Sequence, residues 1–550
     1  MPIFFEQTQA SNKSMRLLWV CLGIFILATY SPLIIQAGIS VDDWGDISHN
    51  LECTTFWHCY GTWFPLFSNR PLAPLPITVM TFALGSWYSG YLLINSLIYL
   101  AGIGICAKVI RGIISLPSAI IFTLFAAIPM VSMPVITSPI NQSTATVSFL
   151  LWSLSLWSLW RFLQSGSWKS WLWAYLLLLL AFLTYEVILP LLVLTAFLPW
   201  IHDSKKFHLF YIRYWAQFVA PIIVVLAIVT LWQKGIAPQY MTVDSRLRFI
   251  PSHALAKLHT FFHVFYKQIP ALFTKMPDYV QWSGIFTAII GVCALIISQF
   301  GCKVAGYQTR SMTKSVNAID NSKSWRFIFI ASLSFLASSF IFILSNESAV
   351  SGGYEARGLS STWFAFAILL AAINSWSFSS NHFWHALSIG ALAIFLGLCT
   401  LSYSIQRDQT IAAWKMQLTI LNDVNQLIAS EKPQDGSVIL GDVPHYLPNN
   451  YNNEIVFSQP WDFGAAIALS NDNRYIAGPV IDSSYGRWNQ LYLKDGIVHA
   501  QNFIGAPLEK LWVYQFDIAK NKGSLIHIQS PEQFMQRFKI SQEQYDNSAR

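Results

Sequence analysis

The sequence from Ile39 to Asn50 reads Ile-Ser-Val-Asp-Asp-Trp-Gly-Asp-Ile-Ser-His-Asn and follows directly on a hydrophobic segment of residues 15–37. Its three aspartates, Asp42, Asp43 and Asp46, therefore lie just outside the end of a predicted membrane-spanning helix. A carboxylate held at the lipid boundary loses part of its hydration, which raises its pKa and can leave one member of an acidic pair as a usable base. The alternative is that these aspartates only end a helix and keep a loop in water.

The composition around this stretch is that of a polytopic membrane protein. The chain has 550 residues, of which 54% are hydrophobic and 11% are charged, whereas an ordinary soluble domain has about 25% charged residues. The net charge of +7 comes from Lys and Arg residues spread along short loops between apolar segments. That distribution is what membrane topology requires, so it does not indicate binding to nucleic acid.

Apolar segments predict about eleven membrane spans. Lys13 and Arg16 lie at the start of the first span, which predicts an uncleaved anchor with a cytoplasmic N-terminus and, with an odd number of spans, a C-terminus outside. The predicted spans are residues 15–37, 91–110, 114–135, 145–163, 171–184, 187–200, 215–232, 285–300, 327–344, 362–373 and 383–403.

The chain divides into two predicted parts. Residues 1–403 form a transmembrane catalytic module, with a first outer loop at 38–90 that contains juxtamembrane helices and a second outer loop at 233–282. Within the second loop, residues 253–273 have the apolar spacing of an amphipathic helix in the membrane interface. Residues 404–550 are more polar and contain a helix to about residue 430, followed by short strands at 437–440, 510–514 and 525–528. They predict a small extracytoplasmic α/β domain.

Two cysteines differ from the five that lie in or beside apolar segments. Cys53 and Cys59 flank Thr-Thr-Phe-Trp-His in the first outer loop. If this loop faces an oxidising compartment, a local disulfide between them is expected. A metal site made of Cys53, His58 and Cys59 is the alternative, although the spacing matches no familiar zinc pattern.

Two further polar features interrupt the apolar sequence. Arg70, in Ser-Asn-Arg-Pro at residues 68–71, begins a short apolar helix and could pair with a phosphate, or it could be an interface arginine with no such role. Tyr185 and Glu186 interrupt an apolar run of about thirty residues. A carboxylate in such a place is costly unless it faces a cavity or a partner, so Glu186 indicates either a site or a structural ion pair.

A short glycine-rich loop precedes the tenth predicted span. It reads Gly-Gly-Tyr-Glu-Ala-Arg-Gly over residues 352–358 and contains Tyr354, Glu355 and Arg357. Glycines let the backbone approach a ligand closely, and Arg357 is nearly the only basic residue on that side. Phosphate binding by Arg357 and a structural salt bridge between Arg357 and Glu355 are the two interpretations.

At these residues the chain resembles the GT-C superfamily of integral membrane glycosyltransferases. The resemblance is to its bacterial branch, with the lipid A aminoarabinose transferase, RgtA/B/C/D-like and protein mannosyltransferase-like enzymes. It covers residues 41–44, Arg70 with its proline, the break at Tyr185 and Glu186, the Arg357 loop and the C-terminal domain. Many relatives have Asp-Glu at the acidic pair, and many have a lysine near the position of Glu186.

The resemblance implies a role for each of these residues. Asp42 or Asp43 would be the catalytic base, and Arg70 and Arg357 would bind the phosphate of the donor. Asp46, Tyr185, Glu186, Tyr354 and Glu355 are the further candidates for substrate binding. Some members of the superfamily use a divalent cation such as Mg or Mn and others do not, so the resemblance leaves the metal open.

The predicted function is transfer of a sugar from a polyprenyl phosphate to a glycan, lipid or protein acceptor outside a bacterial inner membrane, as in modification of lipopolysaccharide O-antigen. No nucleotide site is needed. One alternative is an O-antigen polymerase or ligase that uses basic residues of the second outer loop, namely Arg246, Arg248, His253, His259 and His263. The other is a transporter, against which the few charges inside the spans and the lack of a visible repeat argue.

Overall fold

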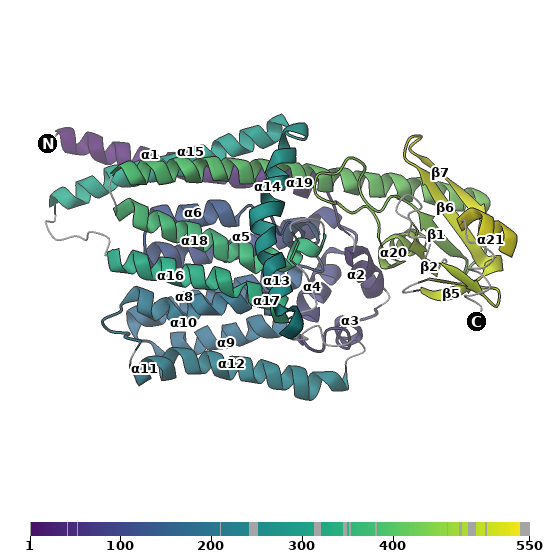
Figure 1. Ribbon diagram of the computed structural model, residues 1–550, viewed down its shortest axis with the longest axis horizontal. Helices are drawn as coiled ribbons and strands as arrows, with labels where there is room; N and C mark the ends of the chain where they lie inside the picture. Colours follow the sequence, from purple (N-terminus) through teal and green to yellow (C-terminus); the bar gives the residue numbers. More distant parts are fainter. Residues whose placement is uncertain are drawn as a thin grey trace.

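The computed structural model consists of a large helical module and a C-terminal domain with two small sheets (Figure 1). The residues that it describes are 2–40, 42–51, 53–209, 211–240, 251–312, 321–344, 349–350, 354–379, 382–458, 460–471, 476–481, 491–500 and 503–538.

Seven stretches of helix in these residues are long and apolar enough to cross a membrane. They are Arg16–Gln36, Tyr88–Ile113, Ile212–Gln239, Trp282–Gln299, Ser322–Ile343, Ala356–Trp376 and Phe383–Glu431. The helices that contain them are α1 (Pro2–Gln36), α5 (Tyr88–Ile113), α11 (Ile212–Tyr214) with α12 (Ala220–Leu231), α15 (Trp282–Met312), α16 (Asn321–Ala337) with α17 (Ser339–Leu344), α18 (Ser360–Ser379) and α19 (His382–Glu431). The predicted class, a polytopic helical membrane protein, is confirmed.

Helices of other lengths complete the module. They are α4 (Pro74–Leu84), α6 (Leu116–Ala126), α8 (Ser143–Ser165), α9 (Trp168–Thr184) and α10 (Leu192–His202), the last preceded by the 3-10 helix η1 (Glu186–Leu191). The break between α9 and η1 falls at Tyr185, where the sequence predicts it. The prediction of one span over residues 114–135 is wrong, because α6 ends at Ala126 and residues 128–133, which contain Pro129, are not helical.

Residues 251–275 form a helical segment that crosses the bundle. The helices α13 (Pro251–His263) and α14 (Ile269–Lys275) are joined by a π-helical turn, Val264–Gln268. In Figure 1 they run across the other helices instead of along them. Phe261 is fully buried and contacts Phe335 and Phe342, with ring centroids 6.0 and 5.9 Å away. A helical segment is therefore present where the sequence predicts one, and its position in the membrane interface stays a prediction.

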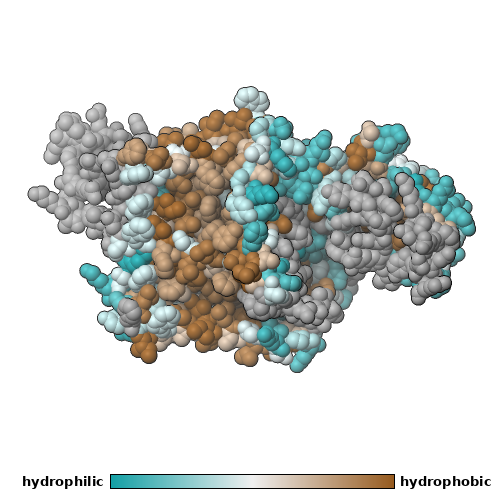
Figure 2. Space-filling view, in the orientation of Figure 1, coloured by the Kyte–Doolittle hydropathy of each residue, from teal (hydrophilic) through white to brown (hydrophobic). Residues whose placement is uncertain are grey.

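The hydrophobic surface follows the long helices. Figure 2 shows a band of hydrophobic side chains over the helical module and hydrophilic side chains over the coloured part of the C-terminal domain. Large apolar side chains on the long helices are exposed, such as Ile223 at 60%, Leu231 at 70% and Trp282 at 85%. Such a surface is suited to lipid and not to water.

The C-terminal domain has an α/β structure, as the sequence predicts. One sheet has the strand order β2-β1-β6-β7, in which β1 (Val438–Asp442) pairs in parallel with β2 (Ile476–Val480) and β6 (Leu511–Asp517), and β7 (Lys522–His527) is antiparallel to β6. A second, antiparallel sheet contains β3 (Tyr492–Lys494), β4 (Ile497–Ala500) and β5 (Phe503–Pro507). Two short helices, α20 (Ala465–Ser470) and α21 (Pro531–Phe538), complete the domain.

Helix α19 joins the two parts of the chain. It is continuous over 50 residues from His382 to Glu431, so the boundary expected at residues 403 and 404 lies inside a helix. Its second half packs against the first sheet, because Ile420, Leu421 and Val424 share a buried cluster with Ile439 and Tyr514. The helix therefore fixes the C-terminal domain at one end of the membrane module.

Candidate active site

The acidic stretch lies where the membrane module meets the C-terminal domain (Figure 1). Helix α2 (Asp42–Leu51) begins with both aspartates in its first turn. Trp44 stacks on Trp414 of α19, with ring centroids 5.8 Å apart, and its Nε1 donates a hydrogen bond to Gln417 at 3.1 Å. A Cβ atom on Gly38 would lie 2.4 Å from the Trp414 ring. The approach to α2 therefore needs glycine at position 38, and α19 fixes the orientation of the helix.

Asp43 is fully buried and accepts hydrogen bonds on both carboxylate oxygens. Its Oδ1 accepts from Ser138 Oγ at 3.1 Å and from the backbone amides of Ile140 and Asn141 at 3.1 and 2.9 Å. Its Oδ2 accepts from the amide of Ser40 at 3.1 Å. Burial raises the pKa of Asp43 to about 7, these hydrogen bonds counter part of that rise, and Asp42 adds to it. Asp43 thus joins α2 to the segment that follows the short helix α7 (Pro134–Thr137).

Asp42 has a different environment from its neighbour. Its side chain is 24% exposed, and its Oδ2 lies 3.6 Å from Nη1 of Arg357, whose side chain is 16% exposed. Arg357 belongs to the 3-10 helix η7 (Tyr354–Leu359) that leads into α18. An N–O distance of 3.6 Å is longer than the roughly 2.7–2.9 Å of a tight charge-assisted hydrogen bond. This contact is therefore looser than a tight hydrogen bond, and both side chains are partly exposed.

A second ion pair lies between the first outer loop and the break after α9. The Nε and Nη2 atoms of Arg70 both donate hydrogen bonds to the carboxylate of Glu186, and the guanidinium lies 4.3 Å from the centre of the Tyr185 ring. Among the residues that the structure describes, the third guanidinium nitrogen, Nη1, has no hydrogen-bond partner. Glu186 is therefore part of an ion pair, and Arg70 is buried at 8% exposure; a role of either residue in a binding site stays a prediction.

The two basic groups influence each other. Burial lowers the pKa of Arg70, the nearby Glu186 carboxylate raises it, and Arg357 lowers it, with a net rise above the ordinary value. The interaction with Arg357 places the two guanidinium groups within electrostatic range. The structure therefore brings together residues from four separate parts of the chain at one end of the helices.

Asp46 lies one turn after Asp42 and is almost fully buried at 5% exposure. Burial raises its pKa well above the ordinary value, Asp43 and Asp42 raise it further, and a hydrogen bond with the Asn141 side chain lowers it. Asn141 therefore contacts two of the three carboxylates, one with its backbone amide and the other with its side chain. One oxygen of Asp46, Oδ2, is buried with no hydrogen-bond partner among the described residues.

Ser138 and Asn141 are the contact residues that sequence reasoning missed. They lie in Ser-Pro-Ile-Asn-Gln at residues 138–142, a polar interruption between two apolar stretches. That interruption was the available signal. It did not reveal the contact itself, because three of the four donors to Asp43 are backbone amides, which every residue except proline carries.

Other predicted site residues have different outcomes. The side chains of Tyr354 and Glu355 lie outside the described residues, as do residues 351–353, 241–250 and Val41, so the proposed salt bridge to Glu355 stays a prediction. The sulfurs of Cys53 and Cys59 are joined in a disulfide, with Cα atoms 5.3 Å apart. Because both sulfurs are in this bond, neither is available as a ligand in the alternative metal site. The described residues contain no group of three or more potential metal ligands.

The fold and the site define a multi-pass helical membrane protein with an acidic and basic cluster at one end of its membrane helices. Among solved structures, the chain is similar to ArnT from Cupriavidus metallidurans. Against the crystal structure bound to undecaprenyl phosphate, the TM-score is 0.37 and the identity 12%, over 87% of this chain and 91% of that chain. Against the apo-state crystal structure, the TM-score is 0.37 and the identity 14%, over 88% and 91%.

No protein-family model and no curated protein matches the chain. A TM-score of 0.37 is too low for the likeness to support a function.

Proposed function

We propose that this protein is an inverting membrane glycosyltransferase of the GT-C type. It would transfer a sugar from a polyprenyl-phosphate donor to a glycan, lipid or protein acceptor outside a bacterial inner membrane, with a cell-surface polysaccharide such as lipopolysaccharide O-antigen as the product. The observation that carries the proposal is the pair of accessible groups Asp42 and Arg357, which lie 3.6 Å apart at one end of the membrane helices. The pair offers a proton acceptor and a phosphate ligand side by side.

The division between the two aspartates supports Asp42 as the base. Within the described residues, Asp43 accepts all its hydrogen bonds from residues 138–141 and from Ser40. Both of its carboxylate oxygens are therefore occupied, and neither is available to a substrate. Asp42 is the more exposed carboxylate, and its recorded ion pair is loose. We assign Asp43 the task of positioning α2 so that Asp42 faces the substrate.

The reaction is a single displacement. Asp42 takes the proton of an acceptor hydroxyl, and the hydroxyl oxygen forms a bond to the anomeric carbon of the donor sugar. The bond from that carbon to the phosphate oxygen breaks, and its electron pair leaves with the polyprenyl phosphate. Arg357 stabilises the negative charge that develops on this leaving group.

Donor binding would also release the base. A phosphate carries more charge than a carboxylate and offers several oxygens to a guanidinium. Because the contact between Asp42 and Arg357 is longer than a tight hydrogen bond, a donor phosphate can replace Asp42 as the partner of Arg357. The carboxylate is then available to the acceptor hydroxyl.

Arg70 is the second proposed phosphate ligand. Glu186 and Tyr185 hold two of its nitrogens and one face of its guanidinium, while Nη1 has no hydrogen-bond partner in the described part of the chain. A guanidinium fixed in this way presents one remaining donor with little loss of side-chain entropy. Tyr185 and Glu186 then act on the substrate through Arg70. A divalent metal such as Mg or Mn stays an untested prediction.

The test is turnover of defined donors. Purified protein in lipid nanodiscs is mixed with a panel of polyprenyl-phosphate sugars, and the release of polyprenyl phosphate is measured with and without candidate acceptors. At least one donor should react, and Asp42→Asn should lower the rate by about 100-fold or more, the usual contribution of a general base. Asp278→Asn, which changes an exposed aspartate of another loop, should leave the rate unchanged. Full activity of Asp42→Asn would refute the mechanism.

A further inference from the structure

A cavity of about 310 Å³ lies at the other end of the membrane module. It is formed where the end of α8 meets the loop before α11 and the π-helical turn Trp215–Val219. In Figure 1, α11 lies at the far end of the bundle from α2 and the C-terminal domain. The length of the membrane helices therefore separates the cavity from the candidate active site.

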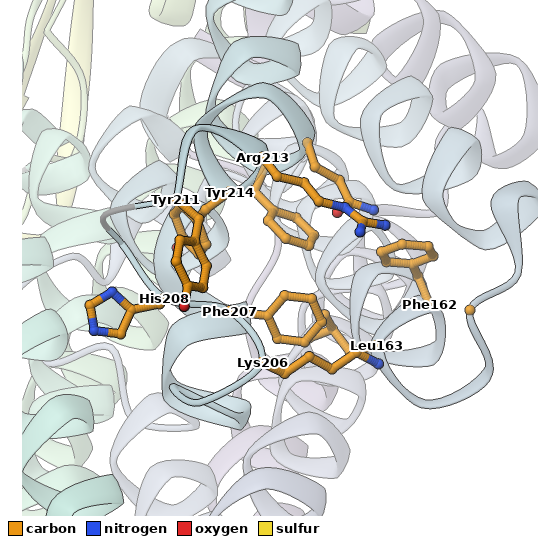
Figure 3. A pocket seen from close by; sticks show the side chains of 11 residues that line it. Phe162, Leu163, Lys206, Phe207, His208, Tyr211, Arg213 and Tyr214 are labelled. Carbon is orange, nitrogen blue, oxygen red and sulfur yellow. The ribbon is translucent and has the colours of Figure 1, made fainter.

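Aromatic and basic side chains share the lining of this cavity. Phe162, Phe207 and Tyr214 form apolar walls, and Lys206 and Arg213 provide charge. Figure 3 shows the guanidinium of Arg213 beside Phe162 and the amine of Lys206 reaching toward Leu163. Two cationic groups from separate segments thus extend to the same side of one hollow.

The segments around the cavity are fixed by specific hydrogen bonds. Asp203 Oδ1 accepts from the backbone amides of Lys205 and Lys206 at 3.0 and 3.1 Å, which sets the turn that carries Lys206. In the π-helical turn, the carbonyl of Gln217 accepts from the side chains of Trp171 and Tyr175 at 3.0 and 3.3 Å. Such π-helical insertions are frequent at functional sites. The cavity is therefore built into the fold at both of its walls.

Neither cation has a carboxylate partner in the described part of the chain. The structure records no ion pair for Arg213 or Lys206, and the Lys206 amine lies 5.3 Å from the centre of the Phe207 ring. Both residues are exposed, and a phosphate that lies between two such cations accepts charge-assisted hydrogen bonds from both. The cavity is therefore suited to an anion attached to an apolar body.

The surroundings of the cavity indicate where this anion comes from. Tyr211, Ile212 and Trp215 are 60%, 87% and 46% exposed at its edge, next to the lipid-facing surface of α12. Large apolar and aromatic side chains at this level of a membrane protein contact lipid at the interface. We propose that the cavity binds the phosphate headgroup of an anionic membrane lipid, with Arg213 and Lys206 as its ligands and the acyl chains along the exposed aromatic edge.

The test measures lipid retention by the full chain. Native mass spectrometry is applied to protein released from nanodiscs that contain phosphatidylcholine and phosphatidylglycerol. Wild type should retain bound phosphatidylglycerol, and a double variant with Arg213→Ala and Lys206→Ala should retain at least about tenfold less, because the loss of even one hydrogen bond to a charged group has about that effect. The matched control neutralises two exposed lysines of the same end, Lys169→Ala and Lys205→Ala, and should retain as much as wild type.

Further arms of the experiment decide between explanations. Equal retention by the pocket variant and wild type would overturn the proposal, as would equal retention of phosphatidylcholine and phosphatidylglycerol by wild type. Displacement of the lipid by inorganic phosphate would show that free phosphate is the ligand and would also contradict it. If the alanine variant unfolds, the variant with Arg213→Gln and Lys206→Gln keeps the side-chain volume and should show the same loss.

Discussion

Replacing Asp43 with asparagine removes a titrating group from the junction between α2 and residues 138–141. In the wild type, burial raises the pKa of Asp43 from 3.8 to about 7, and the hydrogen bonds from Asn141, Ser40 and Ser138 lower it only in part. Between these two values the folded chain holds a proton that the unfolded chain has lost. The free energy of unfolding therefore falls as the pH rises through this window, and the protonated form is the stable one.

The size of the effect follows from the two pKa values. A difference of about three units corresponds to at most roughly 4 kcal/mol, at about 1.36 kcal/mol for each unit. This stability is fully present below about pH 4 and is lost as the pH reaches about 7. Asparagine cannot titrate, so Asp43→Asn should lose this part of the pH dependence. Asp46 titrates in both proteins and contributes to both curves.

The assay is thermal unfolding of detergent-solubilised protein in a series of buffers across this window. Wild type should become less stable toward neutral pH, and the curve of Asp43→Asn should be flatter. Asp278→Asn, at an exposed position, should follow the wild type. Parallel curves for wild type and Asp43→Asn would refute the reasoning. They would show that the four hydrogen-bond donors to Asp43 outweigh its burial and keep it ionised throughout.

Two further predictions concern how the site is held. Gly38→Ala should lower the transfer rate, because its Cβ would lie 2.4 Å from the Trp414 ring and shift the start of α2. The control is Gly23→Ala, whose Cβ would have no atom within 4 Å. This control should match the wild type in the same turnover assay. Glu186→Gln should destabilise the fold by about 3 kcal/mol, because it leaves Arg70 buried without its charge partner. In thermal unfolding, the double variant Arg70→Met with Glu186→Leu should regain most of that stability. The same double variant should bind donor poorly. Full donor binding by it would exclude Arg70 as a phosphate ligand.

Hydropathy predicted most of the fold because crossing a membrane is a local property of sequence. The apolar segments around residues 15–37, 91–110 and 383–403 each contain a helix that is long and apolar enough to span. The failure at residues 114–135 has a local cause as well, since prolines at 129 and 134 interrupt a segment that is apolar throughout. The continuity of α19 was not predictable from composition, because the change from apolar to polar residues near 403 accompanies no change of backbone structure.

The site was less predictable than the fold. Asp42, Arg70, Glu186 and Arg357 attract attention because a charge beside an apolar segment is costly and needs a reason. Which charges pair with each other depends on the packing of helices far apart in the sequence. Arg357 therefore pairs with Asp42 and Arg70 with Glu186, and the sequence alone left both arrangements open.

The tandem of aspartates follows from helix geometry. Consecutive residues on an α-helix point about 100° apart, so Asp42 and Asp43 cannot both face the same cavity. Asp43 turns inward to the donors at residues 138–141, and Asp42 turns outward to Arg357. Asp46 lies one turn further along the helix, and its burial and the two neighbouring carboxylates raise its pKa well above the ordinary value. Under the proposed mechanism, one carboxylate orients the helix and its neighbour takes the proton. Asp42→Asn should then remove the base from a correctly placed helix, and Asp43→Asn should leave the base on a helix that is poorly held.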